Sequence, residues 1–544
     1  MTTHTGILHV FRNRVFRTLW VASLISNIGA MIQLVGASWM MTVLTPSPSM
    51  VALVQAAVTL PLMLGSLPAG VLADNYHRRN VLLFAQIFMF VTSVVLTWLA
   101  FAGLLTPWFL LIFTFLVGCG MALHNPSWQA SFSELVPKQD LPAAVASNAM
   151  GMNVTRSVGP AAGGLIVAIA GAPVAFALNA ISYVTIIAAL LGWKPEYASQ
   201  SLPRERYFSA LWVGIRYFCL SPTLIVSCVR GALFGFAAIS MQALLPLVAR
   251  DKLDADASVF GILLGAFGLG AVFGVLNSAR LRTTFSNEVV LRGGHLFFAL
   301  TCVIVAFSPF TVVTVVTVFC AGMSWINVFP MLNATVQLSS PRWVLGRSIS
   351  IFMTFIFGGM TLGSWVWGYV AQYFTLETAL LASAAVLIGG ALVGFRFPLP
   401  QHGIDDLDPV NRFNEPAINL DLRKRSGPIL IMVEFDIAQD DVSEFLQLMA
   451  DRKRIHIRDG ARQWVLSRDL ERPEIWFETY RFPTWTEYVR HNERRTKADD
   501  MGTDRLFELN RGGDRPRVHR MIERQTALPS DDTPPLARHT DQMH

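Results

Sequence analysis

The chain has 544 residues, of which 53% are hydrophobic and 15% are charged. Ordinary soluble domains carry about 25% charged residues, so this composition excludes a single soluble globule, a disordered chain and a fibrous repeat. Residues 1–400 hold 20 Lys and Arg against 10 Asp and Glu, and residues 401–544 hold the remaining 23 and 27. A long apolar, basic block therefore precedes a charge-dense block. This placement points to a membrane surface as the partner and not to nucleic acid.

The apolar block predicts twelve membrane-spanning helices, since a helix needs about 20 mostly apolar residues to cross a bilayer. The predicted spans are 17–43, 50–73, 80–103, 107–132, 143–170, 174–194, 222–249, 257–280, 288–307, 310–335, 347–373 and 377–397. The first is too long for the core of a signal peptide, so we expect it to be retained. The long gap after the sixth span predicts two six-helix halves, 1–195 and 222–400, joined by a cytoplasmic linker at 196–221.

Positive charges between the predicted spans fall mostly on one side of the membrane. With a cytoplasmic N-terminus, sixteen Lys and Arg lie in loops on that side, and Arg250 and Lys252 lie on the other. Such a bias is typical of cytoplasmic loops, so we expect both termini in the cytoplasm. Arg156 and Arg230 remain inside spans, where a charge is costly and commonly functional, and both are candidate substrate-binding residues.

Two short motifs each occur twice, with nearly the same number of residues between the two copies, and this indicates duplicated halves. Asn125-Pro-Ser127-Trp-Gln129, at the end of the fourth span, returns as Asn333-Ala-Thr335-Val-Gln337 at the end of the tenth. Gly70-Val-Leu at the end of the second span likewise returns as Gly274-Val-Leu at the end of the eighth. Repeated halves across a bilayer are the architecture of secondary transporters, which move one half against the other around a central site.

The loop after the second span reads Gly70-Val-Leu-Ala-Asp74-Asn75-Tyr-His77-Arg78-Arg79 and resembles the signature loop of the major facilitator superfamily. The resemblance implies a cytoplasmic latch between the halves, with Gly70, Asp74, Arg78 and Arg79 as its residues and the region of Gly346-Arg347 as its partner. Asn75 and His77 depart from the usual Arg and Gly. The alternative is a solvated turn that carries positive-inside charge.

The fifth span contains Gly159-Pro160-Ala-Ala-Gly163-Gly164, which resembles a helix-packing motif of the superfamily's exporters. Over about residues 10–400, the pattern is similar to the enterobactin-exporter-like branch of transmembrane secretion effectors. The motifs that carry this likeness are Leu19-Trp20, Ser26-Asn27-x-Gly29, Asn125-Pro-x-x-Gln129, Glu134-Leu-Val-Pro137, Arg156-x-x-Gly-Pro160 and Gly346-Arg347. The likeness implies export of a siderophore, a drug or another small amphipathic metabolite across a bacterial inner membrane.

Polar residues in the spans are candidates for a substrate cavity. Besides Arg156 and Arg230 they are Asn27, Gln33, His124, Asn125 and Asn327. The alternative for Arg156 is a structural residue satisfied by backbone carbonyls, for Arg230 a side chain that reaches towards the cytoplasmic surface, and for His124 hydrogen-bonded packing. Proton coupling is implied by the resemblance, but no Asp or Glu lies well inside any span, and His124 is the candidate that titrates near neutral pH. The five cysteines lack metal-ligand spacing, so we expect neither a metal nor a cofactor.

The charge-dense block predicts a separate α+β domain at 427–525, after a linker at 401–426 and before a disordered tail at 526–544. Strands are expected at 429–437, 463–470, 475–482 and 518–523, with helices at 440–455 and 485–496. The order β-α-β-β-α-β is ferredoxin-like and resembles the dimeric α/β barrel of antibiotic-biosynthesis monooxygenases. Residues that carry this resemblance include Trp464, Glu478, Trp485 and His491. It implies dimerisation, and we expect regulation or assembly and not catalysis.

These observations together predict a secondary active exporter that works by alternating access, and not an enzyme. Its predicted partners are the lipid bilayer, a small-molecule substrate and protons as the coupling ion. Two alternatives stay open on the sequence. One is a membrane-tethered, cofactor-independent oxygenase, and the other is a metabolite sensor built on a transporter scaffold.

Overall fold

The computed structural model describes residues 7–75, 77–194, 207–341, 343–399, 420, 426–493, 496–511 and 516–523. The chain divides into two compact units. The first unit comprises residues 1–204, 223–337 and 346–401, and the second comprises 205–222, 338–345 and 402–544. The predicted tail at 526–544 lies outside the described residues, as does most of the linker predicted at 401–426.

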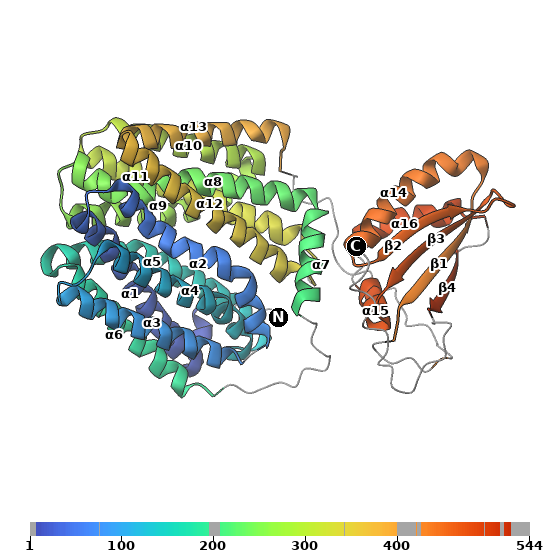
Figure 1. Ribbon diagram of the computed structural model, residues 1–544, viewed down its shortest axis with the longest axis horizontal. Helices are drawn as coiled ribbons and strands as arrows, with labels where there is room; N and C mark the ends of the chain where they lie inside the picture. Colours follow the sequence, from blue (N-terminus) through green and yellow to red (C-terminus); the bar gives the residue numbers. More distant parts are fainter. Residues whose placement is uncertain are drawn as a thin grey trace. The chain divides into compact units, whose positions relative to one another are not determined.

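The first unit is a bundle of long helices (Figure 1). They are α1 (Arg14–Leu44), α2 (Pro48–Asn75), α3 (Arg78–Phe101), α4 (Pro107–Leu135), α5 (Leu141–Ala170), α6 (Ala172–Gly192), α8 (Pro222–Leu247), α9 (Ala257–Thr284), α10 (Asn287–Phe307), α11 (Thr311–Leu338), α12 (Leu345–Tyr373) and α13 (Leu376–Arg396). Short 3₁₀ turns precede α1 and α5, and a π-helical turn at Val248–Lys252 follows α8. Each helix falls within a few residues of a predicted span.

Side chains at the ends of these helices explain where several of them begin. The Asn13 side chain accepts hydrogen bonds from the backbone N–H groups of Val15 and Phe16 at the start of α1. Thr106, Asp256, Ser286 and Thr375 cap later helices in the same way. Large apolar side chains such as Leu165, Leu276 and Val312 stay exposed around the bundle. Such a surface requires an apolar solvent, which a bilayer supplies.

Eleven helices of the described residues are long and apolar enough to cross a membrane. The fifth predicted span, α5, is absent from these eleven although it has 30 residues. Its sequence carries the charge of Arg156 and many small or polar residues, which lower its mean hydropathy. These small residues are what lets α5 pack closely against α1 and α9. A count of twelve spans therefore remains a prediction.

The second unit contains a four-stranded antiparallel sheet with the strand order β2-β3-β1-β4. Its strands are β1 (Ile429–Asp436), β2 (Arg462–Arg468), β3 (Ile475–Phe482) and β4 (Arg517–Ile522). The helices α14 (Val442–Arg458), α15 (Trp485–Glu493) and α16 (Lys497–Leu509) accompany it. Alternate residues of β1 are buried, and Ile431 and Phe435 pack in one core with Phe445 and Met449 of α14.

Two helices of the second unit differ from expectation. The predicted linker 196–221 contains α7 (Tyr207–Cys219), and a helix expected to end near residue 496 is followed by α16. The sequence missed α16 because few apolar residues mark its buried face, of which Leu506 and Leu509 are the main ones. The short helix α7 is ordered by tertiary contacts, since Arg216 donates to the carbonyl of Ala461 over 2.9 Å.

Candidate functional site

We name the two ends of the helix bundle by the course of its first helix. The proximal end is where α1 begins and α2 ends, and the distal end is where α1 ends and α2 begins. The signature loop lies at the proximal end, after α2. The side chains of Gly70 and Asp74 lie outside the described residues.

The two arginines of the signature loop bond to neighbouring helix ends. Arg78 donates to the carbonyl of Ala130 over 2.6 Å and forms an ion pair with Glu134 at 3.2 Å, both in α4. Arg79 donates to the carbonyls of Leu190 and Leu191 at the end of α6. A cation near a helix C-terminus satisfies carbonyls that have no partner within the helix. These bonds therefore join elements of the first half at the proximal end.

The small residues of the fifth helix bring it against two neighbours. Gly159 faces Met31 of α1, and Gly163 lies against the α1 backbone, where an added Cβ would stand 3.0 Å from the Cα of Ile32. Gly164 faces Gly261 of α9 so closely that a Cβ on either residue would overlap the other backbone. The second contact joins the first half to the second in the distal part of the bundle.

Further contacts between the halves lie at the distal end, and hydroxyl pairs continue along α2 and α12, where Thr59 lies 2.8 Å from Thr361 and Ser66 lies 2.6 Å from Thr354. Arg250 donates to the backbone carbonyl of Thr42 over 2.7 Å, and the ring of Trp39 stacks on Phe260. Between α2 and α12, the Ser47 hydroxyl donates to the Gln372 side chain over 2.6 Å. Arg250 is one of the two basic residues predicted on the sparsely charged side, and it joins the two halves there through this hydrogen bond.

One face of α5 changes from exposed to buried along its length. Ala149, Arg156 and Gly163 are spaced by seven residues, which returns to nearly the same face of a helix. Ala149 and Arg156 are exposed, whereas Gly163 is buried. In α1, Ile25 is 43% exposed, and Ile32, seven residues further on, is 7% exposed. Both faces are thus exposed in the proximal half and buried further along, at Gly163 and Ile32, while Val43 near the distal end of α1 is again 69% exposed.

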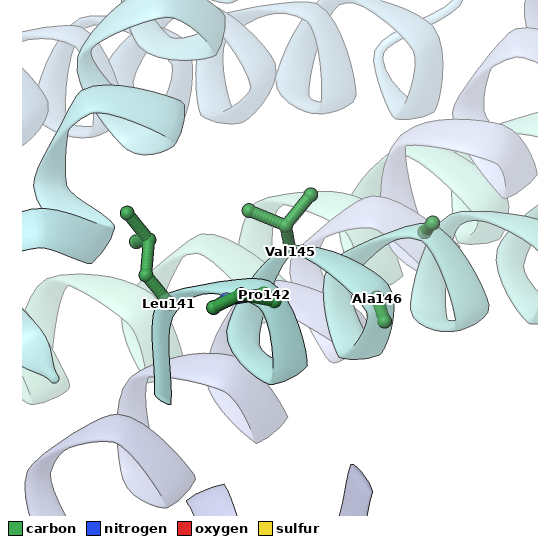
Figure 2. A pocket seen from close by; sticks show the side chains of 5 residues that line it. Leu141, Pro142, Val145 and Ala146 are labelled. Atoms are coloured by element: carbon green, nitrogen blue, oxygen red, sulfur yellow. The ribbon is translucent and has the colours of Figure 1, made fainter. Parts of the chain in front are cut away.

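A pocket of about 560 Å³ runs along the proximal half of α5 (Figure 2). It is lined by Leu141, Pro142, Val145, Ala146 and Ala149, all of them apolar. Arg156 lies on the same helix face two turns beyond Ala149, and no hydrogen bond or ion pair joins its side chain to the described residues. The pocket and the guanidinium together can hold an apolar body and a charged group.

Several predicted cavity residues are satisfied by neighbouring groups. Gln33 is 4% exposed and accepts hydrogen bonds from Ser93, at 3.0 Å, and from Asn179. His124 is 7% exposed, and its Nδ1 lies 3.0 Å from the amide nitrogen of Gln86. The sequence alone did not point to Ser93, Asn179 and Gln86. Their polar side chains in the middle of apolar spans were the available signal.

The three asparagine candidates are more accessible. Asn125 of α4 is exposed, and Asn27 and Asn327 are half-buried. Asn27 donates to Ser23 at 3.3 Å, and Asn327 donates to the carbonyl of Met323 at 2.7 Å, so both bond within their own helices. These two bonds leave the amide oxygens available to another partner.

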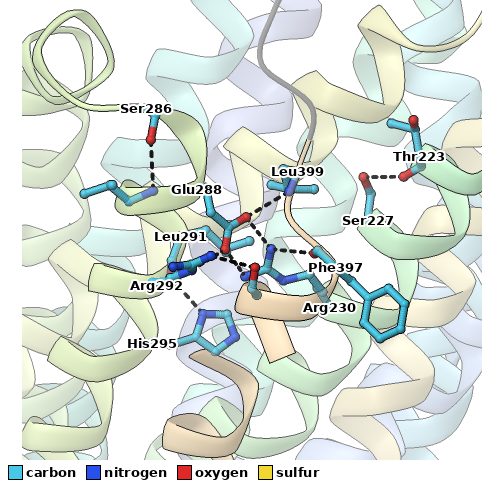
Figure 3. A network of polar contacts seen from close by, with 12 residues as sticks. Thr223, Ser227, Arg230, Ser286, Glu288, Leu291, Arg292, His295, Phe397 and Leu399 are labelled. Carbon is cyan, nitrogen blue, oxygen red and sulfur yellow. Dashed lines mark hydrogen bonds and ion pairs between the residues drawn. The ribbon is translucent and has the colours of Figure 1, made fainter. Parts of the chain in front are cut away.

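Arg230 belongs to a buried ion-pair cluster (Figure 3). It is 1% exposed and donates twice to Glu288, at 2.6 and 3.0 Å. Glu288 also accepts from Arg292 at 2.6 Å and from the backbone N–H of Leu399 at 2.9 Å. The cluster joins α8, α10 and the chain after α13. Since its guanidinium is occupied in this way, Arg230 holds helices together and does not extend into the pocket beside α5.

The second unit has its own buried polar network. Glu478 is fully buried and accepts from Arg452, at 2.9 Å, and from Trp464, at 2.8 Å. The ring nitrogens of His456 and His491 are 2.9 Å apart, and Trp485 is packed in the core. The polar side chains that carried the resemblance to an oxygenase are thus hydrogen-bonded to other side chains of this unit. Such bonds explain these side chains as structural residues.

Comparisons with known proteins agree with this architecture. The family model described as transmembrane secretion effector matches residues 5–527. The staphyloferrin A transporter of Staphylococcus aureus is 26% identical over 258 residues, which cover 47% of this chain and 64% of that protein. The enterobactin exporter EntS of Escherichia coli is 25% identical over 389 residues, 70% of this chain and 90% of EntS. The macrolide efflux protein A of Streptococcus pyogenes is 23% identical over 270 residues, 48% of this chain and 65% of that protein.

Solved structures share the helical fold. A bacterial homologue of the human lysosomal transporter Spinster has a TM-score of 0.58 at 13% identity, covering 71% of this chain and 96% of that structure. The nucleoside transporter NupG has a TM-score of 0.54 at 14% identity, covering 70% of this chain and 98% of NupG. The family and these relatives are transporters and not enzymes, which removes the oxygenase alternative. The chain therefore belongs to the transmembrane secretion effector family of multi-pass membrane transporters.

Proposed function

We propose that this protein exports a small amphipathic metabolite, of the kind represented by siderophores and macrolides, by alternating access across a bacterial inner membrane. The observation that carries the proposal is the exposure pattern of α1 and α5. Both present a face that is exposed in the proximal half and buried further along, at Ile32 and at Gly163. A cavity with one open end, between halves that bond at the other end, is the arrangement that alternating access requires. Staphyloferrin A, enterobactin and macrolides are named for the relatives, and this supports a substrate of that class.

The proposed topology has twelve spans, with α5 as the fifth, and places both termini and the proximal end in the cytoplasm. The excess of Lys and Arg in the loops on that side supports this orientation. Cysteines introduced singly at the exposed positions Ser286, before α10, and Phe310, after it, test it with a membrane-impermeant maleimide in intact cells. We expect labelling at Phe310 and protection at Ser286, and the reverse pattern would refute the orientation.

Counterflow separates transport from the sensor alternative. Proteoliposomes are loaded with extracts of metabolites that accumulate in cells lacking the protein, and uptake of the labelled compound is followed. An exporter exchanges the compound across the membrane, whereas a sensor binds it without exchange. We propose protons as the coupling ion, and an imposed pH gradient should then drive accumulation. Exchange without any response to the gradient would refute proton coupling while preserving the transport assignment.

We propose that the latch at the proximal end forms in the outward-open state, with Asp74 as its acidic residue and Arg347 near its partner. The proposal rests on the signature motif and on the place of Arg347 in the first turn of α12. Asp74→Asn should slow exchange several-fold, and Asn80→Ala, at an exposed position of α3, serves as the matched control. Equal rates in the two variants would contradict the latch.

For the second unit we propose a ferredoxin-like module at 427–525 that assembles with a second copy and has no catalytic role. The strand order β2-β3-β1-β4 and the succession β1-α14-β2-β3-α15-α16-β4, which adds the helix α16 to the ferredoxin-like order, support this fold. The fully bonded Glu478 supports a structural interior. Light scattering of the full-length protein in detergent tests the assembly, and a monomer at all concentrations would refute it.

A further inference from the structure

Arg156 carries a charge in the middle of α5, midway between Leu141 and Ala170. At 1.5 Å per residue it stands about 22 Å from either helix end, which is too far for its side chain to reach the membrane surface. A guanidinium at this depth is costly unless it meets an anion or water. Its surroundings therefore decide what it does.

The carboxylates described in the membrane helices are already paired. Glu134 pairs with Arg78, Glu288 with Arg230 and Arg292, and Glu377 with Lys252. Each of them also lies near an end of its helix. The described residues thus provide no anionic partner at the level of Arg156, and its side chain makes no hydrogen bond or ion pair among them.

The face of α5 that carries Arg156 is the face that carries the pocket. Val145 and Ala149 of the pocket lie eleven and seven residues earlier, both within about 20° of Arg156 on the helix surface. Leu165, nine residues after Arg156 and half a turn around the helix, is 56% exposed on the opposite face. The guanidinium therefore lies in line with the apolar pocket, two turns further along α5.

We propose that Arg156 binds an anionic group of the transported molecule, whose apolar body occupies the pocket lined by Leu141, Pro142, Val145 and Ala149. The ligand class is an elongated amphipathic anion with a carboxylate, sulfonate or phosphate group. Along the helix, the charge stands about 10 Å from Ala149 and about 22 Å from Leu141, given the rise per residue. The planar guanidinium suits such a group because it donates two parallel hydrogen bonds to one oxyanion. This inference rests on the proposed export function and adds the charge of the substrate.

Two aromatic probes of similar size test the assignment. The anion is 1-anilinonaphthalene-8-sulfonate, and the neutral analogue is N-phenyl-1-naphthylamine. Their binding to full-length protein in nanodiscs of zwitterionic lipid is measured by fluorescence, with empty nanodiscs subtracted. Arg156→Gln should weaken binding of the sulfonate by about tenfold or more, since hydrogen bonds to charged groups are worth that much, and should leave the amine within about twofold. Arg156→Lys should keep part of the preference.

The matched control is Arg396→Gln, which removes an exposed positive charge at the end of α13. It should bind both probes as the wild type does. Equal sulfonate affinity in Arg156→Gln and wild type would overturn the proposal. So would an equal loss of both probes, because it would mean a collapsed pocket. Counterflow of the neutral probe tests the export function by itself, since it needs no charge recognition. A wild type that binds the sulfonate through Arg156 but exchanges neither probe would refute export and leave the anion site standing.

Discussion

Removal of the Glu288 carboxylate should destabilise the helix bundle more than removal of a comparable exposed carboxylate. Glu288 receives two hydrogen bonds from Arg230 and one from Arg292, and Arg230 is 1% exposed. Glu288→Ala leaves that guanidinium buried without its counter-ion. Breaking a buried ion pair in this way costs about 3–5 kcal/mol. The loss should reach the lower end of that range because the carbonyl of Phe397 still accepts from Arg230.

The control for Glu288→Ala is Glu377→Ala. Glu377 pairs with Lys252 at 3.3 Å, but its side chain is 43% exposed, so its loss should cost at most about 1 kcal/mol. Unfolding of both variants is followed by tryptophan fluorescence during titration of mixed micelles with a denaturing detergent. If unfolding is irreversible, the half-life at one fixed temperature replaces the free energy.

A double variant distinguishes the buried charge from simple loss of packing. Arg230→Met combined with Glu288→Leu removes both charges and keeps apolar volume, so most of the stability lost in Glu288→Ala should return. An equal cost for Glu288→Ala and Glu377→Ala would refute the reasoning. A double variant no more stable than Glu288→Ala would show that the cluster contributes through its geometry and not through pairing of buried charges.

Three further predictions concern the distal end. Gly164→Leu should abolish exchange by forcing α5 from α9, while Gly293→Leu, at a position with open space, should exchange normally in counterflow. Arg250→Gln should weaken the contact between the halves at the distal end. Cysteines introduced into the pocket should then react severalfold more with a maleimide added outside the cell. Lys252→Gln should cause no such increase, because Lys252 bonds within one half. The pKa of the Asp256 carboxyl is held below its usual value, chiefly by a hydrogen bond from the Ser258 hydroxyl. Its cap therefore stabilises α9 above about pH 4 and is lost as pH falls through the lowered pKa. Asp256→Ala should cost about 1 kcal/mol at neutral pH, and the difference from wild type should vanish in acid, as measured by thermal unfolding across pH.

The positions of the helices could be read from the sequence with small errors at their ends. Runs of apolar residues about as long as a bilayer is thick, separated by turns with Gly, Pro or charge, are a local property of the chain. The position of α5 was read as well as the others, although its small residues, which serve contacts with α1 and α9, lower its mean hydropathy. The strands of the second unit were equally visible, since burial on alternate residues follows the period of a strand.

The roles of individual polar residues were decided by tertiary structure. Arg156 and Arg230 look alike in sequence, as two arginines inside apolar spans. One shares a helix face with a pocket and has no counter-ion among the described residues, and the other is enclosed by Glu288 and Arg292. The sequence made His124 and Gln33 candidates for the cavity. In the structure, Gln86 and Asn179 of neighbouring helices form hydrogen bonds with them. A partner far away in the chain determines whether a buried polar group is satisfied.

The low overall charge is thus an average over two parts of the chain, an apolar membrane block with few charges and a charge-dense C-terminal block. By itself, the sequence determined which segments are apolar enough for the membrane and on which side the scarce charges gather, because both depend on residues close together in the chain. Only the tertiary structure decided that Arg250 joins the halves at the sparsely charged side, that Arg230 is held in an ion-pair cluster and that a pocket lies on the face of α5 that carries Arg156. The physical reason is that helix packing sets the direction of each side chain, and direction determines whether a charge meets protein, lipid or substrate.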